Sequence, residues 1–351
     1  MTATLDTTES LQQADLNQVV QEETRPRASS WPRYIARKGG GALISLAMVV
    51  LLGFFAFRIL PGDPAISMTR GRRVSAEQVE QLRREFGLDQ PLIIQFFHFV
   101  GGLFRGDLGT SYTFHRPVAE LIGSHIGATL LLTGTAAVLS IILGLWLGQR
   151  AAWKRGSLFD KTQTGLALIF WSVPTFWLGL ILLLLFGGFL QWFPTGGLVT
   201  PGSNETGIAL VWDVIRHMVL PVVTMVAVVY AQYLMVMRAS LLEEMTADYL
   251  TTARAKGLRE DLVRRRHAVP NALLPTVTLI FLTLGGLVGG AVTVETVFSW
   301  PGLGYLTFQA LSSPDLPLLQ GTFVVFSSIV IIMNFAADLL YRVLDPRLKA
   351  S

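Results

Sequence analysis

The chain has 351 residues, of which 51% are hydrophobic and only 15% are charged, and its mean hydropathy is +0.51. Soluble domains carry about 25% charged residues, so this composition excludes an ordinary soluble enzyme and a disordered chain. The absence of cysteine excludes a disulfide framework and thiolate metal sites. A net charge of +4 suits either nucleic acid or a membrane, and the positions of the basic residues decide between them.

Residues 1–38 begin with a polar, acidic stretch that is almost free of aromatic side chains, and we expect a disordered N-terminal tail. The first apolar run, residues 39–59, begins too late for a signal peptide and is followed by no small-residue cleavage site. It is long enough to cross the hydrocarbon core, so it predicts a retained first transmembrane helix.

Residues 60–125, called the insertion below, are too long for a simple connection and predict a small helical subdomain. Ser75 and Gln78 have the spacing of a capping box, and Gly87 supplies a stop, so a helix is expected over 76–86. Pro91 opens a second apolar segment that is too short to span and should lie along the bundle or the interface.

Residues 126–345 predict a transmembrane core of five further helices, and residues 346–351 a short C-terminal tail. The fold class expected is therefore an all-α polytopic membrane protein with six transmembrane helices and a helical insertion after the first. An even number of spans places both termini on the same side. The five further apolar runs are 126–149, 165–190, 216–238, 267–295 and 315–338.

The distribution of lysine and arginine predicts the orientation. With the N-terminus inside, 19 of the 28 basic residues are cytosolic, and Arg216 is the only outer one beyond the insertion. Both termini are therefore expected in the cytosol and the insertion outside it, and the basic isoelectric point reflects topology rather than nucleic-acid binding. The inner basic residues are Arg25, Arg27, Arg33, Arg37, Lys38, Arg150, Lys154, Arg155, Lys161, Arg238, Arg254, Lys256, Arg259, Arg264, Arg265, Arg266, Arg342, Arg347 and Lys349.

The cytosolic loop 239–271 carries most of the functional information. Leu242, Met245, Tyr249 and Ala253 fall on one helical face, and Gly257 is a natural helix stop before a second basic stretch. The pattern predicts a helix, a tight glycine turn and another helix. From these residues alone, docking on a partner and resting on an anionic lipid surface are both open.

Several chemistries have no support in the sequence. The chain contains no phosphate-binding G-x-x-x-x-G-K-[ST] loop and neither H-E-x-x-H nor G-x-S-x-G. The five histidines are scattered, so no metal site is expected, and no catalytic residue or cofactor is predicted in this chain. Coupled carriers usually need ionisable groups near the midplane, which the predicted spans lack.

Two outer residues and two sets of glycines are of further interest. Glu295 lies beside Trp300 at the outer end of the fifth predicted span, where both could form a gate or pathway or serve the local structure. The glycines should pack helices closely, which we favour over a substrate surface for the second set. They are Gly144 and Gly148 in one span, and Gly285, Gly286, Gly289 and Gly290 in another.

Six matches in order, with the two stretches of the insertion after residue 65 counted as one, resemble the permease subunits of ABC importers of the dipeptide and oligopeptide branch. Two come from the cytosolic loop, ADYLTTARAKGL (247–258) and RHAVPNALLP (266–275). The others flank it over some 300 residues: LPGDPA (60–65), FGLDQPLIIQF with RGDLGTSY (86–96, 105–112), GGAVTVETVFSWPGLG (289–304) and DLLYRVLDPRL (338–348).

The resemblance implies a permease that forms half of a path for short peptides in a prokaryotic cell membrane. Its expected partners are a second homologous permease, two cytosolic ATPase subunits that bind ATP and Mg, an extracytoplasmic substrate-binding protein and the lipid bilayer. It also implies that the loop docks on an ATPase subunit. The docking residues would be Asp248, Tyr249, Ala253, Arg254, Lys256, Gly257, Leu258, His267 and Asn271.

Two departures and several alternatives remain at this stage. Thr251 and Thr252 stand where many importers have Glu-Ala, and Pro270 stands where a basic residue is common. The same architecture could carry nickel, glutathione or oligosaccharides. A self-sufficient channel or carrier and a membrane-embedded enzyme are the competing classes, and the second lacks a nucleophile and base pair.

Overall fold

The computed structural model describes residues 31–59, 75–85 and 87–344. Within these ranges the chain is helical, with an isolated bridge between Thr110 and Pro117 as its only β-type pairing. The elements are α2 (Trp31–Ile59), α4 (Ala76–Glu85), α5 (Leu92–Phe104), α6 (Val118–Trp153), α7 (Leu158–Ser172), α8 (Thr175–Leu182), the π-helix η1 (Leu183–Phe189), α9 (Ile208–Glu244), α10 (Asp248–Ala255), α11 (Glu260–Val263), the π-helix η2 (Arg264–Ala268), α12 (Val269–Val297), α13 (Leu303–Ser312) and α14 (Leu316–Leu344).

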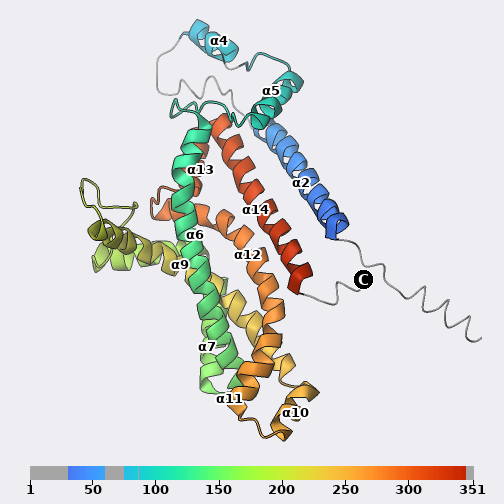
Figure 1. Ribbon diagram of the computed structural model, residues 1–351. Helices are drawn as coiled ribbons and strands as arrows, with labels where there is room; N and C mark the ends of the chain where they lie inside the picture. Colours follow the sequence, from blue (N-terminus) through green and yellow to red (C-terminus); the bar gives the residue numbers. More distant parts are fainter. Residues whose placement is uncertain (1–30, 60–74, 86, 345–351) are drawn as a thin grey trace, which may run out of the picture.

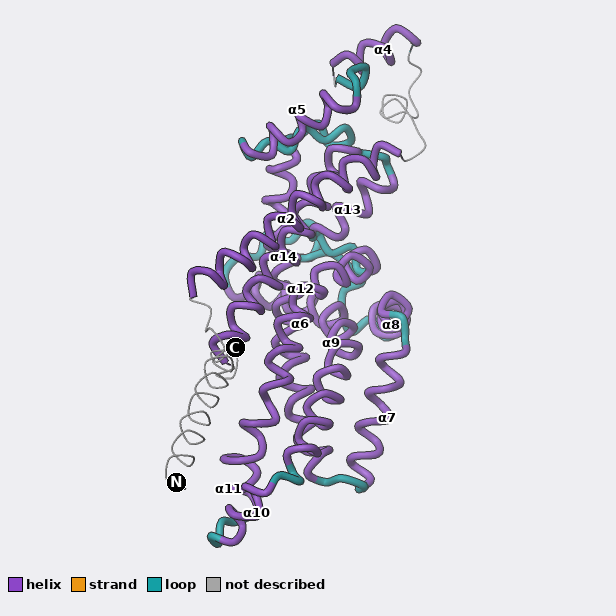
Figure 2. The backbone as a smooth tube through the Cα atoms, turned by 90° about the vertical axis from the view of Figure 1, so that its right-hand side faces the viewer, coloured by secondary structure: helices purple, strands orange, loops and turns teal. Residues whose placement is uncertain are grey.

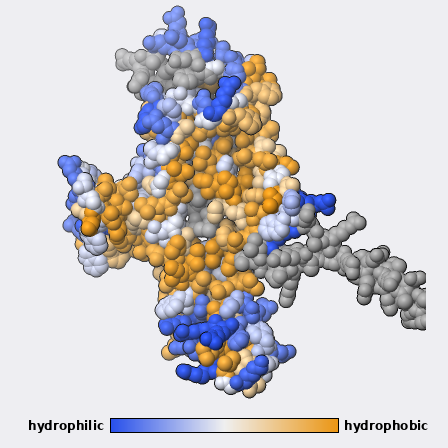
Figure 3. Space-filling model, viewed as in Figure 1, coloured by the Kyte–Doolittle hydropathy of each residue, from blue (hydrophilic) through white to orange (hydrophobic). Residues whose placement is uncertain are grey.

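The bundle is elongated, with α4 and α5 at one end and α10 and α11 at the other (Figure 1). A broad hydrophobic band separates hydrophilic surfaces at these two ends (Figure 3). Helices α2, α6, α9 and α14 are each long and apolar enough to cross a membrane, and α7 with α8 and η1 would make a fifth span. The fifth predicted span, 267–295, corresponds to α12, which has 29 residues; the count of six stays a prediction.

The first helix begins earlier than the sequence indicated. Residues 31–38, assigned above to a disordered tail, form the first two turns of α2. Hydropathy does not detect this start, because charged residues lower the hydropathy without disfavouring a helix. The charged residues here are Arg33, Arg37 and Lys38. Residues 1–30, and with them the rest of the expected tail, lie outside the described residues, as do the LPGDPA motif and residues 345–351.

The third predicted span, 165–190, is not one continuous helix. The chain bends by 101° between α7 and the α8–η1 pair, and Figure 2 shows α8 turned across the direction of α7. Val173 is extended (φ −81°, ψ 129°), as expected for a residue that precedes a proline. Hydropathy does not detect this break because both sides of Pro174 are apolar.

Helices α6 and α9 form the tightest pair of the core. A Cβ atom on Gly144 would lie 2.5 Å from the Tyr233 Cβ, and one on Gly148 would lie 2.7 Å from the Leu234 carbonyl oxygen. The glycines therefore let two backbones approach, as the sequence predicted. Pro221 lies inside α9 without ending it.

The described part of the insertion follows the predictions closely. Ser75 and Gln78 form the reciprocal capping box, with the Ser75 amide donating to Gln78 Oε1 at 2.9 Å and the Gln78 amide to Ser75 Oγ at 3.3 Å. Gly87 has φ +61° and Pro91 precedes α5. Asp315, fully buried, accepts from Ser111 Oγ at 2.6 Å and so attaches the insertion to the start of α14.

Candidate functional site

The 239–271 loop folds back on the bundle at the end opposite the insertion (Figure 1). Helix α9 runs to Glu244, α10 follows after a short turn, and α11 and η2 lead into α12. Gly257, at the end of α10, has φ +80°, and nothing lies within 4 Å of the position a Cβ would take there. The predicted glycine turn is therefore required by backbone conformation and not by a crowded neighbour.

One face of α10 is covered by the chain itself. Leu250 is fully buried and Ala253 is 5% exposed, and both belong to an apolar cluster with Met237 and Leu241 of α9 and Ala272 of α12. The close packing expected at Ala253 is packing within this chain, and its assignment to a surface for a partner stays a prediction. The periodicity of an apolar helical face indicates that the face is buried, but it does not say whether the same chain or a partner buries it.

Three of the predicted residues meet in a polar cluster that joins α10 to α12. The Tyr249 hydroxyl donates to the Glu244 carboxylate. Asn271 Nδ2 donates to the Tyr249 oxygen at 2.9 Å and to the His267 carbonyl at 3.1 Å. Partial burial, with the Glu244 hydrogen bond second, raises the pKa of Tyr249, so its hydroxyl remains protonated. His267 takes part through its backbone.

Most of the remaining predicted residues lie on the outward side of the loop. Asp248 and Lys256 are exposed, whereas Leu258 is half-buried and packs against the apolar cluster. Arg254 Nε lies 2.8 Å from Glu260 Oε1, so its predicted contact at the edge of a docking surface starts from an ion pair within the loop. The outward side therefore carries charges of both signs.

An ion pair that the sequence analysis missed attaches the start of α7 to the loop end of α9. Arg238 donates from Nε to Asp160 Oδ1 at 2.6 Å and from a terminal nitrogen to Oδ2 at 2.8 Å, and Asp160 is 3% exposed. The Gly156 amide also donates to Asp160, at 3.0 Å. The available signal was Ser157, whose side chain accepts from the Asp160 amide and caps the first turn of α7.

At the opposite end of α12, Glu295 is a structural centre. It is fully buried and accepts from Thr129 Oγ1 at 2.7 Å and from the Gly304 and Tyr305 amides at 2.7 and 3.0 Å. The carboxylate therefore satisfies the free amides at the start of α13. Trp300 is buried and donates to the Ala128 carbonyl at 2.9 Å. These bonds favour the structural alternative for both residues.

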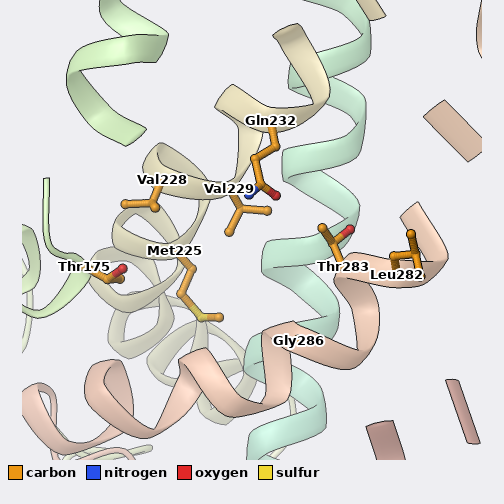
Figure 4. A pocket seen from close by; sticks show the side chains of 8 residues that line it. All are labelled: Thr175, Met225, Val228, Val229, Gln232, Leu282, Thr283 and Gly286. Carbon is orange, nitrogen blue, oxygen red and sulfur yellow. The ribbon is translucent and has the colours of Figure 1, made fainter. Parts of the chain in front are cut away.

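A pocket of about 310 Å³ lies between α8, α9 and α12, and we call it the helix pocket (Figure 4). Its walls are mostly apolar, with Thr175, Gln232 and Thr283 as polar exceptions. Gly286 contributes to it, with no atom within 4 Å of the position of a Cβ, whereas the sequence favoured helix packing there. A glutamine in the middle of an apolar helix was the signal for this pocket. The lining residues are Thr175, Met225, Val228, Val229, Gln232, Leu282, Thr283 and Gly286.

No group of three or more potential metal ligands occurs among the described residues. The apolar helical bundle, the pocket between its helices and the folded polar loop define a membrane permease. Residues 140–350 match the family described as binding-protein-dependent transport system inner membrane component, and residues 32–133 match its N-terminal companion family. The chain belongs to this family of transport permeases.

Named relatives agree over almost the whole length. The dipeptide transport system permease protein DppB of Escherichia coli K12 is 38% identical over 334 residues, covering 90% of this chain and 98% of that protein. A putative peptide permease of Brucella suis is 39% identical, covering 89% and 97%. A chain of the inward-facing MetNI methionine ABC transporter shares the fold, with a TM-score of 0.52 and 19% identity over 64% of this chain and 96% of that one.

Proposed function

We propose that this chain is the membrane-spanning permease subunit of an ATP-driven importer of short peptides. The observation that carries the proposal is the continuous likeness to dipeptide permeases, which covers 90% of this chain and 98% of the relative. A di/tripeptide permease of Pseudomonas aeruginosa is 37% identical over similar shares of both chains. Short peptides are therefore the cargo class.

The distribution of basic residues supports an orientation with the 239–271 loop and both termini in the cytosol. A second homologous permease would complete the path, and two cytosolic ATPase subunits would bind ATP and Mg. An extracytoplasmic binding protein would deliver peptide at the insertion. The lipid bilayer would cover the hydrophobic band.

The outward side of the loop is the proposed docking surface for an ATPase subunit. Asp248 and Lys256 are exposed there, Arg254 is exposed at its edge, and Leu258 is half-buried against the apolar cluster. Ala253 and Leu250 act on the other side, where they attach α10 to α9 and α12. The outward face of α10 would thus receive a displacement from the ATPase subunit, and its inner face would transmit it to α9 and α12.

Transmission of a displacement from the loop to the transmembrane helices needs a rigid connection between them. The Tyr249–Asn271 hydrogen bond connects α10 to α12, and the Asp160–Arg238 pair connects α9 to α7. Closure of the ATPase subunits would tilt these helices together and change access to the helix pocket between them. The ATPases can bias this change only through different contacts with the two states.

ATP-driven uptake in proteoliposomes tests the proposal. The chain is co-purified with its partners, reconstituted with ATP inside, and supplied with binding protein and radiolabelled L-alanyl-L-alanine outside. We expect uptake that requires both hydrolysable ATP and binding protein. Uptake by the isolated chain without ATP would refute the importer and support a channel or carrier instead.

A further inference from the structure

A second pocket, of about 450 Å³, lies at the insertion end, and we call it the insertion pocket. It is bounded by the end of α2, by α5, by the segment before α6 and by the first turns of α14, which Figures 1 and 2 place together at this end of the bundle. Unlike the helix pocket it is rich in polar side chains. Those that matter here are Arg58, Gln95, His98, Asp107, Tyr112 and Gln320.

Arg58 is held firmly in one orientation. Its guanidinium lies over the Phe54 ring at 4.6 Å, and one terminal nitrogen donates to Gln95 Oε1. Gln95 is itself positioned, because its amide donates to the Gln90 carbonyl at 2.7 Å. The Nε of Arg58 is nevertheless buried without a hydrogen-bond partner among the described residues.

Gln320 supplies a second donor of the same kind. The residue is 5% exposed and lies on α14 at the wall of the pocket, and its Nε2 is buried without a partner in the part of the chain that the structure describes. Buried polar atoms are almost always hydrogen-bonded, so two orphaned donors on one pocket call for an acceptor. Neither donor can accept a hydrogen bond in turn.

The other polar side chains that line the pocket are compatible with a negatively charged acceptor. Burial raises the pKa of Tyr112 to about 12, so the phenol stays protonated at neutral pH. One oxygen of Asp107, the acidic group of the pocket, is engaged by the Gly109 amide at 2.8 Å. A carboxylate matches an arginine and a planar amide better than a neutral carbonyl does, because both its oxygens accept.

We propose that the insertion pocket binds a carboxylate through Arg58 and Gln320. The carboxylate belongs either to the C-terminus of a free short peptide or to an acidic side chain of the docked binding protein. The chemistry is the same, and the concave, partly acidic pocket fits a small zwitterion best. The choice of ligand rests on the proposed function, whereas the two orphaned donors do not.

Two variants and one control test the pocket in the intact complex in nanodiscs. Gln320→Glu is isosteric, and it replaces the amide donor by a negative charge that repels a ligand carboxylate. Arg58→Gln removes the cation. Arg105→Gln removes an exposed arginine of the insertion that does not line the pocket. Basal ATP hydrolysis and the elution volume of each complex report on folding and assembly.

Binding is measured in two arms, first with L-alanyl-L-alanine and its C-terminal amide, then with binding protein in place of peptide. Peptide binding that weakens at least tenfold in both variants, and for the amide, assigns the carboxylate to the peptide. Weakened docking of binding protein alone assigns it to that protein. If both variants match Arg105→Gln in both arms, or if peptide binding lost in the variants is equally strong for the amide, the proposal is wrong. Absence of ATP-driven uptake by the wild type would instead refute the proposed function.

Discussion

The two ends of the molecule differ in whether their polar side chains are paired. At the end that holds the 239–271 loop, the buried Asp160 pairs with Arg238, and the exposed Tyr249 pairs with Glu244 and Asn271. In the insertion pocket, Arg58 and Gln320 each keep a buried donor without a partner among the described residues. A closed network suits a part that transmits force, because it has no stable alternative arrangement. An open one suits a part that receives a ligand.

Breaking the closed end should have the largest effect. Asp160→Ala leaves Arg238 without its bidentate partner and the Gly156 amide without its acceptor. Loss of one member of a buried pair costs about 3–5 kcal/mol, and the 24% exposure of the arginine puts this case at the lower end. Thermal unfolding in detergent should show a Tm lower by several degrees, while the exposed Asp248→Ala should leave Tm unchanged. Equal Tm values would show that the pair does not hold α7 to α9.

The contact between α6 and α9 provides the next test. Gly148→Ala would place a Cβ 2.7 Å from a backbone carbonyl, which cannot move aside as a side chain can. We expect a loss of about 1–3 kcal/mol in the free energy of unfolding, measured by thermal or denaturant unfolding. Gly134→Ala, on the same helix with open space around its Cβ, is the matched control and should be neutral or slightly stabilising.

A smaller loss of stability with a larger functional consequence is expected at Tyr249. Tyr249→Phe removes the hydroxyl that joins Glu244 to Asn271 and should cost about 1 kcal/mol. ATP hydrolysis should continue while peptide transported per ATP falls. Thr251→Ala, an exposed neighbour on α10, is the control. Unchanged transport per ATP would place the transmission elsewhere.

The same tyrosine predicts a pH dependence with a definite sign. Its pKa is raised above the ordinary value of 10.0, so the folded state favours the protonated phenol. The associated stabilisation should be complete below pH 10 and should disappear as the pH rises through the raised pKa. Wild type minus Tyr249→Phe stability should therefore be constant from pH 6 to 9 and decline above that range. A difference that grows with pH would contradict the hydrogen-bond assignment.

The smallest effect should be at the outward surface. Arg254→Ala breaks an exposed ion pair with Glu260 and should change the free energy of unfolding by less than about 1 kcal/mol. Its effect, if α10 docks on an ATPase subunit, is weaker association, which pull-down of the ATPase from the purified complex measures. Arg259→Ala is the control, because it removes the charge of an exposed arginine that lies beyond Gly257 and outside α10.

Sequence reasoning succeeded where one local rule decides the structure. The capping box at Ser75 and Gln78 and the turn at Gly257 depend on residues within one helical turn, and both were predicted. The close approach at Gly144 and Gly148 was also predicted, although the partner helix was not. A residue without a side chain permits contact but does not select it.

The misses share a different cause. Pro174 accompanies a 101° bend, whereas Pro221 and Pro275 lie inside continuous helices, so the proline alone does not decide. Packing around each proline determines whether the chain bends there. The inward direction of Ala253 and the pairing of Asp160 with a residue 78 positions away likewise depend on tertiary contacts. The periodicity of a single segment carries no information about these tertiary contacts.

The glycine contacts between α6 and α9 also carry a consequence for the order in which the structure opens. Tyr230, Tyr233 and Leu234 touch α6 through positions that no side chain separates, so solvent reaches their amides only if the two helices part. These amides should exchange with deuterium among the slowest in the chain, and α4, which is mostly exposed, among the fastest. Local opening of the permease would then occur at its periphery, while α6 and α9 stay in contact through many transport cycles.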